Sequence, residues 1–338
     1  MSSIAVPPMT RVTWYRHRAA LLGIIAAFGA ASAFLLIDGF LLRSWLSSHH
    51  IAGCLVIFGS GSANCRSGSG SAALQSFYDK TTFRPDVPWS LIAIAPALAL
   101  FAGLPWVTRE FDTGSFRYTW VQSINPRRWL LGTFGSLAVT AAAAAALCGM
   151  AFGWWFQLAQ WQGLYPGYPW YWEHFDLTPL SMASWTLLAM ALALVIGVVV
   201  RRTVPAMAAF VPVYGAWLYC AIWWLRPHLF TLGAVVKPDS LGGPSHVWRW
   251  NDYQVDSWFT GPDGHRVAFD SVLRRIPWDR LGGSADQWLA RHHYTYWISY
   301  QPAGRIWVFQ LAWAAILLTI AAACVLAAVW LLRKRPAQ

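Results

Sequence analysis

The chain has 338 residues, of which 57% are hydrophobic and only 12% are charged. Soluble domains carry roughly a quarter charged residues, so this composition excludes an ordinary soluble protein and indicates an integral membrane protein. The net charge of +11 does not indicate a nucleic-acid-binding protein, because the arginines stand at the ends of apolar runs and form no single patch.

Six apolar runs are long enough to cross a bilayer, which requires roughly 20 helical residues. The first run follows a basic and aromatic lead-in that ends at Arg18. A cleaved signal peptide is the alternative for this run, but the apolar part of such a peptide spans only about 7–15 residues. We therefore expect an all-α integral membrane protein with spans at about 19–42, 89–107, 129–155, 180–200, 204–225 and 305–332.

The loop between the first and second spans is rich in Ser and Gly and contains Cys54 and Cys65. If this loop faces an oxidising compartment, the two thiols can form a disulfide. Two free thiols are the alternative. The other cysteines, Cys148, Cys220 and Cys324, lie within apolar runs and are expected to act as packing residues.

The distribution of basic residues predicts the orientation of the chain. With both termini in the cytoplasm, twelve Lys and Arg residues fall in inner segments and four in the two shorter outer loops. The loop at 226–304 is set aside, because long translocated segments largely escape the positive-inside rule. The rule therefore predicts cytoplasmic termini and a large extracytoplasmic loop or cap at 226–304 within a single transmembrane domain.

The stretch from Trp106 to Trp129 is a short polar interruption between the second and third spans. Its Phe116, Trp120 and Ile124 are spaced to share one face of a helix. The sequence Asn125–Pro126 would end that helix, because the residue before a proline is disfavoured in the α region. These residues alone leave two alternatives open, a helix that lies on lipid and a helix that contacts a partner protein.

No sequence motif for catalysis or metal binding is present. The chain has no phosphate-binding loop, no H-E-x-x-H and no nucleophile elbow, so we predict no catalytic residue, metal or cofactor in it. The pairs His49–His50 and His292–His293 are adjacent and do not share a helix face. Asp38 is the only carboxylate within an apolar run, whereas a proton relay needs several ionisable groups in the membrane.

An enzymatic function remains the alternative to a non-catalytic one. A polytopic membrane enzyme could act on lipid or glycan through the loop at 226–304. Its acids and bases would come from carboxylates and a histidine of that loop. These residues are Asp252, Asp256, Asp263, His265 and Asp270.

The polar stretch also resembles a known family. The pattern Arg109-Glu110-x-x-x-Gly114-Ser115, followed by Trp120-x-Gln122-Ser123 and Arg127-Arg128-Trp129, is similar to the loop between spans two and three of ABC-2 type transporter permeases, above all their actinobacterial branch. Ser115 departs from that pattern, because threonine is usual there. Agreement continues at Arg201-Arg202-Thr203-x-Pro205, at Arg226–Pro227 and at Trp307-x-x-Gln310.

The resemblance implies the permease subunit of an exporter in the bacterial plasma membrane, which moves an amphipathic or hydrophobic cargo. ATP and Mg would be bound by a separate ATPase subunit, and the permease would pair with itself or a paralogue within the membrane lipids. A cytoplasmic coupling helix at about 113–124 would sit in a groove of the ATPase, whose closure switches the spans between two states. The resemblance assigns coupling to Arg109, Glu110, Gly114, Phe116, Arg117, Trp120 and Gln122.

Overall fold

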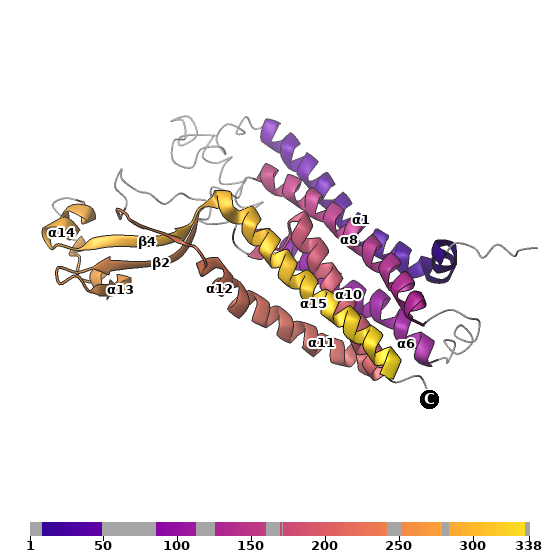
Figure 1. Ribbon diagram of the computed structural model, residues 1–338. Coiled ribbons are helices and arrows are strands. Elements are labelled where there is room, and N and C mark those ends of the chain that lie inside the picture. The colour runs from indigo at the N-terminus through magenta and orange to yellow at the C-terminus, as the bar shows by residue number, and fades with distance from the viewer. Residues whose placement is uncertain are drawn as a thin grey trace, which may run out of the picture.

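The computed structural model describes residues 9–48, 86–112, 126–159, 170, 172–241, 252–278 and 284–334. Its long helices form a bundle, and a small β-sheet lies beyond one end of that bundle (Figure 1). We call this end the sheet end and the opposite one the far end. The described chain stops at the far end, after the last helix.

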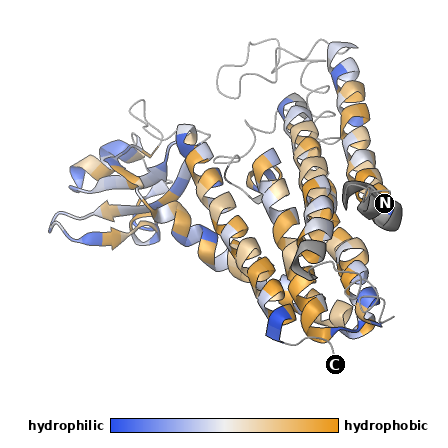
Figure 2. Ribbon diagram, turned by 45° about the vertical axis from the view of Figure 1, so that its right-hand side comes forward, coloured by the Kyte–Doolittle hydropathy of each residue, from blue (hydrophilic) through white to orange (hydrophobic). Residues whose placement is uncertain are grey.

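Six helical segments are long and apolar enough to cross a membrane, as the sequence predicts. They are Arg18–Trp45, Val87–Asp112, Leu130–Gln157, Pro179–Val200, Thr203–Thr231 and Ala303–Lys334. Figure 2 shows apolar residues along these helices and hydrophilic residues gathered at their ends and on the sheet. The protein is therefore a multi-pass membrane protein.

The spans are built from the following elements. They are α1 (Met9–Ser48), α5 (Asp86–Leu98), η1 (Ala99–Gly103), α6 (Leu104–Asp112), α8 (Pro126–Ala159), α10 (Pro179–Val200), α11 (Thr203–Cys220), η4 (Ala221–Leu225), α12 (Arg226–Thr231), η6 (Ala303–Arg305) and α15 (Ile306–Lys334). The short helix α9 (Trp172–Phe175) precedes α10. The second and fifth spans run beyond the predicted ends at 107 and 225, because the polar residues that follow continue each helix.

Helix α10 is the centre of the bundle. It packs against α5, α6, α8, α11 and α15, whereas α1 packs chiefly on α8. Two glycines permit the closest of these approaches. A Cβ at Gly149 would lie 2.7 Å from the Cα of Pro179, where α8 passes the start of α10, and a Cβ at Gly197 would overlap the side chain of Val107 on α6.

Two spans contain a π-helical turn. The turn η1 includes Phe101, four residues before Pro105, and η4 includes Trp223, four residues before Pro227. A proline offers no N–H to the carbonyl four residues earlier, and its ring crowds that carbonyl. A wider turn relieves this conflict. Pro96 and Pro212 lie in segments that stay α-helical, so a proline permits such a turn without dictating it.

The segment between the fifth and sixth spans forms a sheet, so the expectation of an all-α protein is wrong here. The strands are β1 (Val235–Pro238), β2 (Tyr253–Thr260), β3 (Arg266–Ala268) and β4 (Thr295–Gln301). They pair antiparallel in the order β1-β4-β2-β3. Helices α13 (Phe269–Leu273) and α14 (Ala285–Arg291) complete this unit. β2 and β4 are rich in aromatic and β-branched residues, which favour strands.

The sheet has a hydrophobic core of its own. Its buried members are Phe259, Val272, Ile276, Leu289 and Tyr296. Burial raises the pKa of the Tyr296 phenol, and the nearby Asp239 raises it further against a hydrogen bond with Ser257 that lowers it. This core is separate from that of the helical bundle.

Polar contacts fasten the sheet to the bundle where the chain crosses between them. The fully buried Gln301, at the end of β4, donates from Nε2 to the carbonyl oxygens of Phe230 (3.0 Å) and Leu232 (2.8 Å). The Asp252 carboxylate accepts a hydrogen bond from the backbone N–H of Ala303 at 2.8 Å. Both connections are therefore held at the helix ends, and the sheet is anchored to α12 and α15.

Candidate functional site

Arg109 and Glu110 lie in a helix and not in the polar loop where the sequence placed them. They belong to the last turn of α6, at the far end of the bundle. Arg109 is exposed, whereas Glu110 is 7% exposed. Both line a groove of about 520 Å³ whose opposite wall includes Ala20 and Gly23 of α1. Polar residues at the end of a span can continue its helix. Arg109 and Glu110 do so in α6, beside residues of the neighbouring α1.

The end of α6 is tied to the turn between α10 and α11. The Asp112 carboxylate accepts hydrogen bonds from the Thr203 hydroxyl at 2.7 Å and from the Thr203 backbone N–H at 3.3 Å. The hydroxyls of Thr108 and Thr203 share a further hydrogen bond of 2.9 Å. Asp112 therefore supports the first turn of α11, where a helix has unpaired N–H groups.

The turn itself is tight, as the sequence indicates. Arg201 ends α10 in the left-handed region, with φ of 59°, and its guanidinium lies 5.6 Å from the centre of the Phe111 ring on α6. Arg202 is extended and Thr203 begins α11. At the far end, the contacts of Thr203 and Arg201 therefore hold α6, α10 and α11 together.

The other residues to which the sequence assigns coupling lie outside the described part of the chain. They are Gly114, Phe116, Arg117, Trp120 and Gln122. The coupling helix therefore stays a prediction. The same holds for the disulfide between Cys54 and Cys65 and for the pair His49–His50.

A buried ion pair near the sheet end was not predicted from the sequence. The Asp176 carboxylate, just before α10, accepts from Arg226 Nη2, with both oxygens at 2.6 Å. The side chains are 3% and 5% exposed, respectively. Because Arg226 lies within the fifth span and is buried, the expected outer loop begins later than 226.

Aromatic rings and a third donor complete the surroundings of this pair. Trp185 donates from its indole Nε1 to Asp176 Oδ1 at 3.0 Å. The guanidinium of Arg226 lies 5.2 Å from the Phe175 ring and 5.0 Å from the Trp313 ring. Such contacts offset part of the free energy lost when charges leave water.

A signal for this pair exists in the sequence. Asp176 precedes the fourth span and Arg226 ends the fifth, so two spans that run in opposite directions bring both residues to one end of the bundle. The prediction missed it because it assigned Asp176 to an outer loop and Arg226 to the start of the next one.

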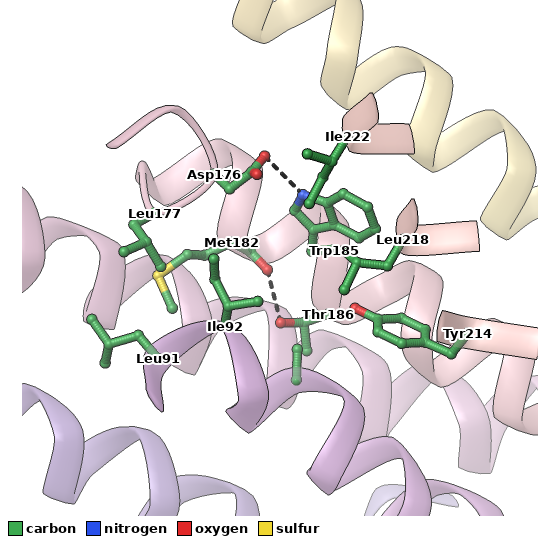
Figure 3. Close-up of a pocket in the computed structure, with 11 residues that line it drawn as sticks. Leu91, Ile92, Asp176, Leu177, Met182, Trp185, Thr186, Tyr214, Leu218 and Ile222 are labelled. Atoms are coloured by element: carbon green, nitrogen blue, oxygen red, sulfur yellow. Dashed lines mark hydrogen bonds between the residues drawn. The ribbon is translucent and has the colours of Figure 1, made fainter. Parts of the chain in front are cut away.

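The ion pair adjoins a small pocket of about 20 Å³ between α5, α10 and α11. Figure 3 shows the Asp176 carboxylate at one side of this pocket and the Tyr214 hydroxyl at the other, with apolar side chains from all three helices between them. The lining consists of Leu91, Ile92, Ala95, Asp176, Leu177, Met182, Trp185, Thr186, Tyr214, Leu218 and Ile222.

Comparison with known proteins now decides the family. The sequence profile described as "ABC-2 membrane transporter related" matches residues 10–226, which is well over half of the chain. The protein belongs to the ABC-2 membrane transporter related family. Neither the curated proteins nor the solved structures contain a match to this chain.

Family membership and the helical architecture agree on a membrane transporter permease. Subunits of the ABC-2 type are generally non-catalytic transmembrane chains that work with an ATP-hydrolysing partner. The matched range takes in the first four spans, most of the fifth, the polar stretch from Trp106 to Trp129 and the ion pair. It ends at Arg226, before the sheet.

The four carboxylates and the histidine that a membrane enzyme would use are dispersed over the sheet unit. Asp252 precedes β2 and Asp263 follows it, and the eight residues of that strand separate its ends by roughly 27 Å at 3.4 Å per residue. Asp263 accepts from the backbone N–H of His265 in the turn between β2 and β3. Asp256 pairs with Arg266 on the surface, and Asp270 lies in the first turn of α13. These five residues do not form one site.

Side chains that could bind a metal do not cluster in the described part of the chain either. Within the described ranges, no cluster of three or more His, Cys, Asp or Glu side chains could hold a metal ion. His292 follows α14 and stacks on Trp288, with ring centres 4.0 Å apart. His293 adopts a left-handed conformation at φ of 57°. The Asp38 carboxylate accepts a hydrogen bond from Trp155 Nε1 at 2.8 Å, which links α1 to α8.

Proposed function

We propose that this chain is the permease subunit of an ABC-2 type exporter in the plasma membrane. A separate ATPase subunit would supply the energy, and the cargo would be an amphipathic or hydrophobic molecule. The family match over residues 10–226 carries this proposal, because it includes the polar stretch between the second and third spans.

The contacts of Thr203 support a mechanical role for that stretch. Residues 113–125 join Asp112 of α6 to Pro126 of α8. A partner that displaces them pulls on α6, and the hydrogen bonds of Asp112 and Thr108 transmit that movement to Thr203. From Thr203 the fifth span runs to Thr231, beside the anchored sheet. Movement at the far end can therefore reach the sheet end through one span.

The distribution of charge supports the orientation. Exposed Arg109 and Arg202, together with Arg333 and Lys334, lie at the far end of the spans. Basic residues favour the cytoplasmic side. We therefore assign the far end, with both termini, to the cytoplasm and the sheet to the outside. Pairing with a second permease copy, identical or paralogous, belongs to the same proposal.

Substitutions in the coupling stretch test the proposal. In the chain reconstituted with the ATPase subunit that copurifies with it, we expect Glu110→Ala and Gly114→Trp to abolish both stimulated ATP hydrolysis and export. Gly132→Trp is the control, because no heavy atom lies within 4 Å of the Cβ position at Gly132. Unchanged export in both coupling variants would refute the role of this stretch.

A further inference from the structure

The groove at the far end lies between the first span and the second. Helix α1 packs chiefly on α8 and only lightly on α5 and η1, and its first turns lie at the same end of the bundle as α6 (Figure 1). The space between the two spans measures about 520 Å³, which is in the range of ligand sites. Helix α1 lines it with Ala19, Ala20 and Gly23. These residues are small, so they leave the space open.

The second span forms the other wall of the groove with one face of its helix. The residues that line the groove from Leu98 to Glu110 recur every three or four positions, so they share that face. The rise from Leu98 to Arg109 is roughly 16 Å at 1.5 Å per residue. One leaflet of the hydrocarbon core is about 15 Å thick, half of the whole. The groove is therefore about one leaflet deep.

The inner part of the groove is apolar. From Leu98 to Trp106 its wall consists of apolar side chains. The Phe101 side chain belongs to this wall and is 70% exposed, so it offers a large surface to a ligand. An apolar groove of this depth within a bilayer suits an acyl chain.

The charged residues of the groove lie at its far end. Arg109 and Glu110 belong to the last turn of α6, and the exposed Arg18 precedes Ala19 on α1. Two arginines and one carboxylate give this end an excess of positive charge. A guanidinium has five N–H donors and binds a phosphate through two of them. Arg109 can therefore bind a phosphate beside the contacts that it already makes.

We propose that this groove binds one anionic phospholipid, with an acyl chain between the two spans and its phosphate at Arg109. The depth of one leaflet fits the chain, and basic pockets between spans bind anionic head groups. The excess positive charge favours a head group with net negative charge over a zwitterionic one, which brings a cation of its own. The inference requires neither an ATPase partner nor a particular orientation in the membrane.

The test uses the purified full-length chain in phosphatidylcholine nanodiscs. A small fraction of the lipid is phosphatidylglycerol with a diazirine on one acyl chain. After irradiation, peptide mass spectrometry should place label on residues 19–23 and 98–106, and the yield should saturate as the fraction of probe rises. Labelling of the other lipid-facing helices should rise linearly. Absence of saturable label on 19–23 and 98–106 would overturn the proposal.

Two substitutions change the groove. Gly23→Trp fills it, because no heavy atom lies within 4 Å of the Cβ position there, and should abolish the saturable label. Arg109→Gln removes the phosphate contact and should weaken the apparent affinity about tenfold, the effect of one hydrogen bond to a charged group. Full affinity in the glutamine variant would refute the assigned head-group contact.

Each substitution has a matched control. Gly29→Trp makes the same change on α1, also with nothing within 4 Å, at a position that does not line the groove. Arg202→Gln removes the charge of an exposed arginine at the far end that does not line the groove either. Both should label as the native chain does. Equal loss of label in Gly23→Trp and Gly29→Trp would contradict a site in the groove.

Competition then identifies the chemistry of the head group. Unlabelled phosphatidylglycerol should displace the probe at a lower fraction than phosphatidylethanolamine does. Equal or stronger displacement by phosphatidylethanolamine would show a zwitterionic lipid, and displacement by soluble glycerol phosphate would show a phosphate site without a chain; either result refutes the proposal. The test contains no ATPase and no ATP, so it fails or succeeds separately from the exporter proposal.

Discussion

The Asp176 carboxylate and the Arg226 guanidinium meet at 2.6 Å although 50 positions separate them in the chain. The contact joins the start of α10 to the fifth span, beside the pocket and next to the connection to the sheet. The ion pair therefore lies where α10, the fifth span and the connection to the sheet meet. Its removal should be felt in all of them.

Breaking this pair should destabilise the protein strongly. We expect Asp176→Asn or Arg226→Met to lower the free energy of unfolding by about 3–5 kcal/mol, because one buried charge is left unpaired. Denaturant titration of the detergent-solubilised chain measures this change. The double variant should lose less than the sum of the single ones.

The exposed pair of Asp256 and Arg266 provides the control for that experiment. Asp256→Asn should change the free energy of unfolding by less than about 1 kcal/mol, because exposed pairs contribute little. Similar losses for Asp176→Asn and Asp256→Asn would contradict the importance of burial.

The hydroxyl of Thr203 should matter for transport more than for folding. Thr203→Val removes the hydrogen bonds of the hydroxyl to Asp112 and Thr108, keeps that of the backbone N–H to Asp112, and should reduce ATP-driven export, with little change in the amount of inserted protein. Thr203→Ser keeps the hydroxyl and should retain export. If the valine variant exports like the serine variant, movement does not pass through this contact.

Glycine at position 149 should be required for packing. Gly149→Ala places a methyl group 2.7 Å from the Pro179 Cα, and such overpacking costs about 1–3 kcal/mol. Its melting temperature in detergent should fall. Gly153→Ala on the same helix meets nothing within 4 Å and should leave the melting temperature unchanged or raise it, since alanine favours a helix.

The orientation can be checked by chemical labelling of intact cells. Trp278 is 56% exposed on the sheet unit, and Arg202 is exposed at the far end. A membrane-impermeant maleimide should label Trp278→Cys in intact cells and Arg202→Cys only after permeabilisation, with each site identified by peptide mass spectrometry. The reverse pattern would invert the assignment.

We expect high pH to lower the stability of the sheet through ionisation of the Tyr296 phenol. Its pKa is raised above the ordinary value of 10.0, so the folded sheet retains a proton that the unfolded chain loses. Stability is then constant below about pH 10 and falls as the pH rises above it. Hydrogen exchange of residues 253–260, corrected for intrinsic pH dependence, should speed up between pH 9 and 11.5. Tyr296→Phe should reduce that change, and a change equal to that of the native chain would exclude Tyr296 as its source.

Local sequence accounts for the parts of the fold in which neighbouring residues decide the outcome. Long apolar runs determine the six spans, since only helices satisfy the backbone within lipid. The sequence Arg201-Arg202-Thr203 indicates a tight turn, and the structure places a left-handed residue there. The motif that begins at Arg109 and Glu110 identified the family, which the match over residues 10–226 confirms.

Tertiary structure alone decided the remainder, because it depends on residues far apart in the chain. The sheet forms because β2 and β4 pair although they are far apart in the sequence. The segment that contains them is rich in Trp, Gly and Pro, and its strands were not predicted. The central place of α10 follows from its packing against six elements of the bundle. Asp112 met Thr203, Asp176 met Arg226, and the Tyr214 hydroxyl faced a pocket only once the helices were assembled. Hydropathy fixes which segments enter the membrane, and shape and charge complementarity between them decide which residues meet.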